Sequence, residues 1–226
     1  MTLRYRCLLL DHDDTAMDST ATVHHPAHVA SMALLRPGER AVDLEGFFLK
    51  NFMPGFESFL REELTFSDAE MAVEYRIWRD FAERLRPQFF PGFLDALEAY
   101  RAQGGLFVVV SHSESDIIRR HYLETGRNLM PDEVFGWEAG EGRRKPEPWP
   151  VAETLRRFGL APGEVLVVDD LRPGILMAKA AGVPSAAAGW AHRLPAVRAY
   201  MEANTLGILD SIEAFRTFIL QPRGAL

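Results

Sequence analysis

Short apolar runs that alternate with helical patterns constrain the fold of this chain most strongly. The runs occupy residues 5–10, 106–110, 133–137 and 164–168, and a weaker run occupies 184–190. A polar or glycine-containing loop and then a helical pattern follow the main runs. Strands this uniformly apolar are buried on both faces, which is typical of parallel strands joined by crossover helices. The sequence therefore predicts an α/β fold with a doubly wound, Rossmann-like parallel sheet.

Residues 17–87 interrupt this alternation, because they carry helical patterns and no convincing strand. Ser67 and Glu70 form a capping-box pattern ahead of an imperfect apolar stripe. We therefore predict an α/β core made of residues 1–16 and 88–226, with a small helical domain inserted after the first strand.

Composition and charge exclude several classes of function. The net charge is −7 and there is no basic run, so neither a nucleic acid nor an anionic membrane surface is an expected partner. A single cysteine excludes an internal disulfide framework. No stretch approaches the length of a membrane span, and the first apolar run is too short for a signal peptide. We therefore expect a cytoplasmic protein.

Polar residues gather where the predicted strands end, which is where open α/β sheets bind their ligands. Like charges this close repel one another, and a hard divalent cation such as Mg²⁺ relieves that repulsion by taking carboxylate oxygens as ligands. A lysine and a hydroxyl group at the same edge would suit an anionic group on a substrate. The residues concerned are Asp11, Asp13, Asp14, Ser111, Lys145, Asp169 and Asp170.

The first two of these segments match known motifs. Asp11, Asp13 and Thr15 give D-x-D-x-T after a strand, and Ser111 ends the next core strand. Alone, D-x-D-x-T would be weak support for a function. The period of a strand places Asp11 and Asp13 on the same side of the strand end.

Two further segments complete an ordered set of four. Lys145 opens the sequence KPEP, and Asp169 and Asp170 end an apolar strand that is followed by A-x-x-A-G. With this set the chain resembles the haloacid dehalogenase-like (HAD) superfamily of hydrolases over about two thirds of its length. The inserted helical segment resembles the helical C1 cap that many members carry between the first two motifs.

The resemblance implies a phosphatase that works through an aspartyl-phosphate on Asp11, with Asp13 as general acid and base. It implies Mg²⁺ as the cofactor, bound by Asp11, the backbone carbonyl of Asp13 and Asp170. Asp169 would either assist as a ligand or orient Asp170 from behind it. Substrate contacts are expected from Thr15, Ser111, His112, Lys145 and, in the cap, Lys50.

Several alternatives stay open. Asp13 argues against a dehalogenase, because members that dehalogenate lack this second aspartate. A phosphomutase of the β-phosphoglucomutase type would use the same pair of aspartates, and a non-catalytic protein that binds a phosphorylated ligand is the third possibility. The expected partner is a small phosphorylated metabolite, which the sequence leaves open among sugar phosphates, phosphoglycolate-like acids and nucleoside monophosphates. The oligomeric state also stays open.

Six residues depart from the family pattern or stand outside it. Asp14 and Gly174 occupy positions where the family often has a glycine and a second metal-binding aspartate, respectively. His12 replaces a usually apolar residue, and the sequence offers no explanation for it. His24, His25 and His28 are interpreted as a polar surface turn rather than a zinc site, because no cysteine or placed fourth ligand accompanies them.

Overall fold

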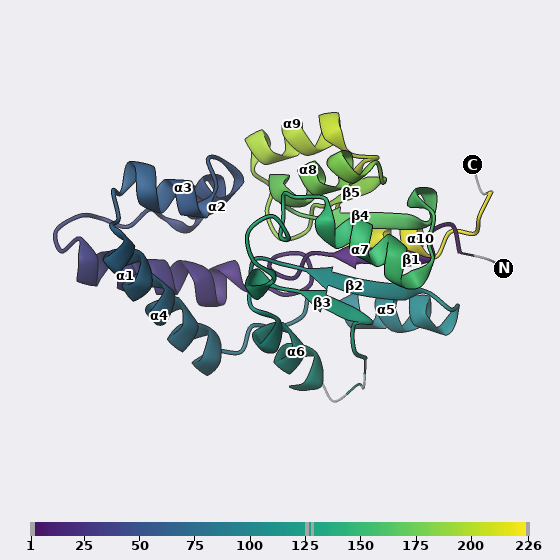
Figure 1. The fold of residues 1–226 in the computed structure, drawn as a ribbon, viewed down its shortest axis with the longest axis horizontal. Helices are drawn as coiled ribbons and strands as arrows, with labels where there is room; N and C mark the ends of the chain where they lie inside the picture. The colour runs from purple at the N-terminus through teal and green to yellow at the C-terminus, as the bar shows by residue number, and fades with distance from the viewer. Residues whose placement is uncertain (1–2, 125–126, 128, 225–226) are drawn as a thin grey trace. The chain divides into compact units, whose positions relative to one another are not determined.

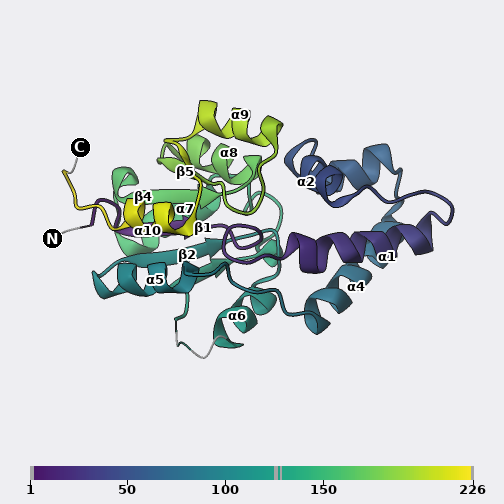
Figure 2. The same cartoon turned by 180° about the vertical axis from the view of Figure 1, so that it is seen from behind.

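The computed structural model of the protein describes residues 3–124, 127 and 129–224. It divides the chain into two compact units (Figures 1 and 2). The core unit consists of residues 1–17 and 89–226, and the helical unit consists of residues 18–88. The boundaries expected from the sequence lie one residue away from each of these.

The core unit contains a parallel sheet of six strands, which confirms the predicted fold class. The strands lie in the order β3-β2-β1-β4-β5-β6. The five strands expected from the sequence all form, whereas β6 has only two residues and was not predicted. The strands are β1 (Cys7–Leu10), β2 (Leu106–Val110), β3 (Glu133–Phe135), β4 (Val165–Asp169), β5 (Ser185–Ala188) and β6 (Ile208–Leu209).

Alternation along the strands builds two separate apolar cores, one on each face of the sheet. Leu8 and Leu10 of β1 belong to one cluster, and Cys7 and Leu9 belong to the other. This is the period of two that an extended chain imposes on its side chains. Because both faces are covered, every residue of β1 is buried, as the uniformly apolar runs predicted.

Helices of the core unit cover both faces of the sheet (Figures 1 and 2). Side chains of α5, α6 and α10 pack against one face, and side chains of α7 and α8 pack against the other. The helix α9 lies beside α8. The helices are α5 (Phe93–Ala102), α6 (Ser115–Glu124), α7 (Trp149–Phe158), α8 (Arg172–Ala181), α9 (Pro195–Asn204) and α10 (Ile212–Ile219), with 3-10 turns at Trp137–Ala139 and Pro162–Glu164.

The register of the central strands brings distant parts of the sequence to one edge. Leu10 of β1 lies opposite Val168 of β4, and the backbone amide of Asp11 donates to the Val168 carbonyl at 3.0 Å. The chain runs from β1 outward to β2 and β3 and then crosses back to β4 on the other side of β1, so the strand order reverses there. A crevice at such a reversal is where doubly wound sheets bind ligands.

The helical unit consists of helices without a strand of the sheet, as the sequence predicted for this segment. The capping box is confirmed: Ser67 accepts from the backbone amide of Glu70, and the Glu70 side chain accepts from the backbone amide of Ser67. Its elements are a π-helix at Thr20–His24, α1 (His25–Leu35), α2 (Leu44–Phe52), α3 (Phe56–Ser58), a π-helix at Phe59–Glu63 and α4 (Asp68–Arg84).

The polar surface turn expected at His24, His25 and His28 is wrong. These residues end the first π-helix and begin α1, and His28 is only 1% exposed. Its ring lies 5.1 Å from that of Phe47 and 5.6 Å from that of Phe59. Both ring nitrogens are buried without a hydrogen-bond partner among the described residues. His28 is therefore a core residue of the helical unit, held there by aromatic packing.

Among the residues that the structure describes, no helix combines the length and the apolar character needed to cross a bilayer.

The burial of His28 predicts a pH-dependent stability. Burial, with a smaller effect of His25, lowers the pKa of His28 from 6.5 to about 4. Between these values the unfolded chain binds one proton more than the folded chain, so this part of the stability is present above pH 6.5 and is lost as the pH falls. In the wild type, this effect should lower the unfolding free energy by about 2 kcal/mol between neutral pH and about pH 5. We expect His28→Leu to lack this decrease.

Urea denaturation of both proteins at the two pH values measures this difference. Val29→Leu, at an exposed position on the same helix, is the control and should keep the wild-type pH dependence. Equal pH dependence in wild type and His28→Leu would contradict the assignment of His28 as the titrating group.

Candidate active site

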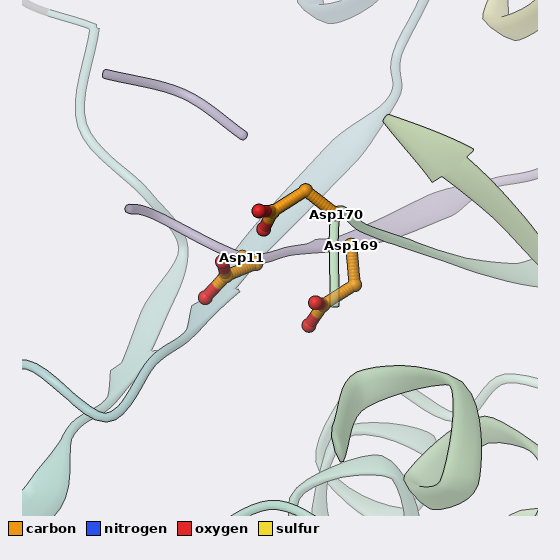
Figure 3. A group of neighbouring side chains, drawn as sticks. All are labelled: Asp11, Asp169 and Asp170. Atoms are coloured by element: carbon orange, nitrogen blue, oxygen red, sulfur yellow. The ribbon is translucent and has the colours of Figure 1, made fainter. Parts of the chain in front are cut away.

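A buried lysine bridges two carboxylates at the edge where β1 and β4 end. Lys145 Nζ lies 2.6 Å from Asp11 Oδ1 and 2.8 Å from Asp169 Oδ2. Lys145 is 6% exposed and Asp169 is 1% exposed, so water screens this arrangement little. Asp170 completes the group, and ligand oxygens of Asp11, Asp169 and Asp170 lie within 4.8 Å of one another (Figure 3).

One lysine does not offset the negative charge of this cluster. Burial raises the pKa of Asp11 well above its usual range, although Lys145 opposes the shift. Burial and the charge of Asp169 raise the pKa of Asp170 to about 8. Burial alone would lower the pKa of Lys145, but Asp11 and Asp169 outweigh it and the net pKa is raised. The cluster therefore favours additional positive charge, either as protons or as a metal ion.

Thr15 and His192 each contact a different oxygen of the Asp170 carboxyl group. Thr15 Oγ donates to Oδ1 at 3.3 Å, and His192 Nε2 lies 3.2 Å from Oδ2. Burial lowers the pKa of His192, which favours the neutral form of its ring. His192 was absent from the predicted site residues. It follows the weakest of the predicted strands, and nothing in its local sequence indicated a contact with Asp170.

Asp13 lies in a different environment, made of hydroxyl groups. Its Oδ2 accepts from Ser111 Oγ at 3.1 Å and from Ser113 Oγ at 2.7 Å. Ser113 was also absent from the predicted site residues, although it lies two positions after Ser111. Both serines follow β2, whose neighbour in the sheet is β1.

The structure explains two residues that depart from the family pattern. Asp14 has a φ of 58°, in the left-handed region where glycine is favoured and aspartate is tolerated. His12 is fully buried, and its Nε2 lies 2.9 Å from Nδ1 of His121 on α6. Burial and the neighbouring His12 lower the pKa of His121 to about 3, and the two rings form a hydrogen-bonded pair. His12 therefore links the end of β1 to α6.

Because Gly174 has no side chain, there is room beside it for the Asp169 carboxyl group. A Cβ atom at Gly174 would lie 1.9 Å from Asp169 Oδ2, much closer than any real contact. The Asp169 carboxyl group accepts from the Leu171 backbone amide at 2.9 Å through Oδ1, and from Lys145 through Oδ2. Both of its oxygens are thus engaged away from Asp170.

The last two predicted residues have other contacts. The His112 ring lies with Nε2 2.8 Å from the Lys145 carbonyl oxygen, and it meets the Trp137 ring edge-on at 5.9 Å. Lys50 belongs to the helical unit, where it forms an ion pair with Glu63 and lies over the Phe59 ring. The remaining predicted residues meet in the core unit: Asp11, Asp13, Thr15, Ser111, Lys145, Asp169 and Asp170.

Comparison with known proteins shows the family to which the chain belongs. The family model of haloacid dehalogenase-like hydrolases matches residues 5–182. A phosphoglycolate phosphatase from Thiobacillus denitrificans is 21% identical over 189 residues, which cover 80% of this chain and 82% of that protein.

Solved structures share the fold over nearly the whole chain. A haloacid dehalogenase-like family protein from Streptococcus pneumoniae has a TM-score of 0.75 at 17% identity, covering 95% of this chain and 98% of its own. CbbY from Rhodobacter sphaeroides, in complex with xylulose 1,5-bisphosphate, has a TM-score of 0.70 at 17% identity, covering 92% and 95%. At these identities the likeness establishes the fold alone.

The contact between Gly174 and Asp169 predicts the effect of adding one methyl group. Alanine is the better helix former by about 1 kcal/mol, so helix propensity alone predicts that Gly174→Ala stabilises α8. We expect the opposite, a loss of about 2 kcal/mol in unfolding free energy, because the methyl group displaces Asp169 from Lys145.

Urea denaturation measures this loss. Gly163→Ala is the matched control, because a Cβ there meets nothing within 4 Å. A Gly174→Ala protein as stable as Gly163→Ala would show that the Asp169 carboxyl group moves aside without cost.

Proposed function

Because the chain belongs to the haloacid dehalogenase-like hydrolases, we propose that it is a phosphatase that hydrolyses a small phosphomonoester through a covalent intermediate on Asp11. The observation that carries this proposal is the placement of two differently supported carboxyl groups. Asp11 lies beside the Lys145 ammonium group, whereas Asp13 is held by neutral hydroxyl groups. A nucleophile beside a cation and an acid held by neutral donors are what two-step phosphoryl transfer requires.

In the first proposed step, a carboxylate oxygen of Asp11 attacks the phosphorus atom as the bond from phosphorus to the leaving oxygen breaks. The leaving oxygen takes the proton of the Asp13 carboxyl group and departs as an alcohol. In the second step, a water molecule gives a proton to Asp13 and attacks the same phosphorus atom. The bond between phosphorus and Asp11 breaks, inorganic phosphate leaves, and both aspartates return to their starting states.

Ser111 and Lys145 would bind the transferring phosphoryl group. Its equatorial oxygens carry the charge in the transition state, and donors fixed beforehand stabilise that charge most effectively. Lys145 is fixed by its two carboxylate partners, and Ser111 is buried and accepts from the Ser113 backbone amide at 3.0 Å. We assign Thr15 to the support of Asp170, and His112 and Lys50 stay predicted substrate contacts.

The carboxylate cluster fits a divalent cation. Oxygen ligands suit Mg²⁺, and burial together with the neighbouring carboxylates raises the pKa values of Asp11 and Asp170. Asp11, Asp170 and the backbone carbonyl of Asp13 would hold the ion, with Asp169 engaged by Lys145. When bound, the ion neutralises charge on the phosphoryl oxygens and lowers the repulsion that an anionic substrate meets.

The class of substrate is a small phosphorylated metabolite. The name of the Thiobacillus denitrificans relative favours phosphoglycolate-like acids, and the sugar bisphosphate bound to CbbY keeps sugar phosphates in the set. A phosphomutase would return the phosphoryl group to a sugar instead of passing it to water, and would need a bisphosphate activator.

We expect phosphate release from a panel that contains phosphoglycolate, sugar phosphates and nucleoside monophosphates. Release should require Mg²⁺ and stop with EDTA. Asp11→Asn should lower kcat/KM by about three orders of magnitude or more, because an amide oxygen is a poor nucleophile. A colorimetric phosphate assay measures all of these.

Asp95→Asn, an exposed aspartate on α5 paired with Arg127, is the control and should keep full activity. Slow release that a sugar bisphosphate accelerates would favour the mutase. If no substrate of the panel releases phosphate, although the protein is folded and calorimetry shows that it binds Mg²⁺, a binding protein would be favoured instead.

A further inference from the structure

Ser113 makes a shorter hydrogen bond to Asp13 than Ser111 does. Its Oγ lies 2.7 Å from Asp13 Oδ2, and Ser111 Oγ lies 3.1 Å from the same oxygen. The backbone of Ser113 is fixed on both sides: its amide donates to Ser111 Oγ at 3.0 Å, and its carbonyl accepts from the Trp137 amide at 3.0 Å. Ser113 is 4% exposed. Its hydroxyl group is therefore held at Asp13 by a buried residue whose backbone is hydrogen-bonded on both sides.

The number of hydrogens that each hydroxyl group can donate distinguishes the roles of Ser111 and Ser113. A serine hydroxyl group has one hydrogen to donate. In the proposed function, Ser111 donates that hydrogen to an oxygen of the transferring phosphoryl group. It cannot donate to Asp13 at the same time, so the substrate takes one of the two donors away from Asp13 Oδ2. Ser113 still donates to that oxygen.

We propose that Ser113 is the positioning residue of the Asp13 carboxyl group during protonation of the leaving oxygen. This inference rests on the proposed function. A protonated carboxyl group keeps one oxygen as an acceptor, and the other carries the hydrogen. By donating to Oδ2, Ser113 fixes the rotation of the carboxyl group and directs the other oxygen, with its proton, to the leaving group. Ser111 can then donate to the phosphoryl group while Ser113 keeps the Asp13 carboxyl group in its orientation.

This role predicts a dependence on the leaving group. An alkoxide, such as the one phosphoglycolate releases, is strongly basic and needs a proton as it departs. The p-nitrophenolate ion is a weak base and departs without one. Misplacing the general acid therefore slows the first substrate and leaves the second nearly unchanged. A defect of folding or of phosphoryl binding would slow both equally.

The experiment compares kcat/KM for the two substrates in Mg²⁺-loaded wild type and variants, because kcat/KM reports the step that breaks the leaving-group bond. We expect Ser113→Ala to lower kcat/KM about 10- to 100-fold for phosphoglycolate, or for whichever alkyl phosphate of the panel is hydrolysed best. For p-nitrophenyl phosphate the change should stay within about threefold. Ser113→Thr keeps the hydroxyl group and should restore the wild-type ratio of the two substrates.

Two further variants sharpen the outcome. Ser115→Ala removes the next serine along the chain, which begins α6 and whose hydroxyl group contacts Glu138, and it should leave both substrates unaffected. Asp13→Asn should show the same selective loss for the alkyl phosphate, and adding Ser113→Ala to it should cause no further loss.

Equal loss on both substrates, or no loss on either, would overturn the role of Ser113 and leave the proposed function intact. Failure of the wild type to hydrolyse either substrate would overturn the proposed function itself and this inference with it. The wild-type measurement alone therefore distinguishes the two failures.

Discussion

The contact between Lys145 and the carboxylates of Asp11 and Asp169 is the interaction on which the rest of the site depends. The two aspartates follow or end adjacent strands whose register sets them at the same edge of the sheet. Their separation is therefore fixed by the backbone, and they cannot relieve their repulsion by moving apart. A buried ion group of this kind contributes little net stability, but removing one partner is costly because the others stay buried and uncompensated. The fold thus tolerates the cluster only with a cation in place.

The same constraint explains the residues around the cluster. Asp169 reaches Lys145 because Gly174 leaves room for its carboxyl group, and the Leu171 amide engages its other oxygen. Asp170 instead meets the hydroxyl group of Thr15 and the neutral ring of His192. Adjacent aspartates thereby acquire different partners, one cationic and the other neutral. This difference favours Asp170 over Asp169 as the carboxylate that binds a metal ion.

The sequence predicted the features that depend on local pattern. Apolar runs indicated the parallel strands, and the rule that ligands bind beyond strand ends was enough to assign Asp11, Ser111 and Asp169 to one edge of the sheet. The two-residue strand β6 was too short to leave a pattern. His28 was misplaced because its aromatic neighbours, Phe47 and Phe59, lie far along the chain, so its local sequence appears polar.

Contacts between residues far apart in the sequence could not be predicted either. Ser113 and Asp13 are 100 positions apart, and His12 and His121 are 109 apart. No periodicity connects such pairs, and only the packing of β2 and α6 beside β1 brings them together. The resemblance to a family supplied the residues common to its motifs. It did not supply Ser113 or His192, which act on those residues from outside the motif positions.

The separation of the two aspartates into different electrostatic environments would allow one strand end to serve the two chemical roles proposed for it. Asp11 and Asp13 are two positions apart, and each carries the same functional group. Asp11 lies against a buried ammonium group, which stabilises its charged and nucleophilic form against the effect of burial. Asp13 is partly exposed and meets hydroxyl groups, which donate to it without adding a charge. A group that must gain and lose a proton in each cycle is better served by neutral partners than by a cation, because a cation would hold it permanently ionised. The proposed division into nucleophile and acid therefore rests on which residues the folded chain places beside each carboxyl group.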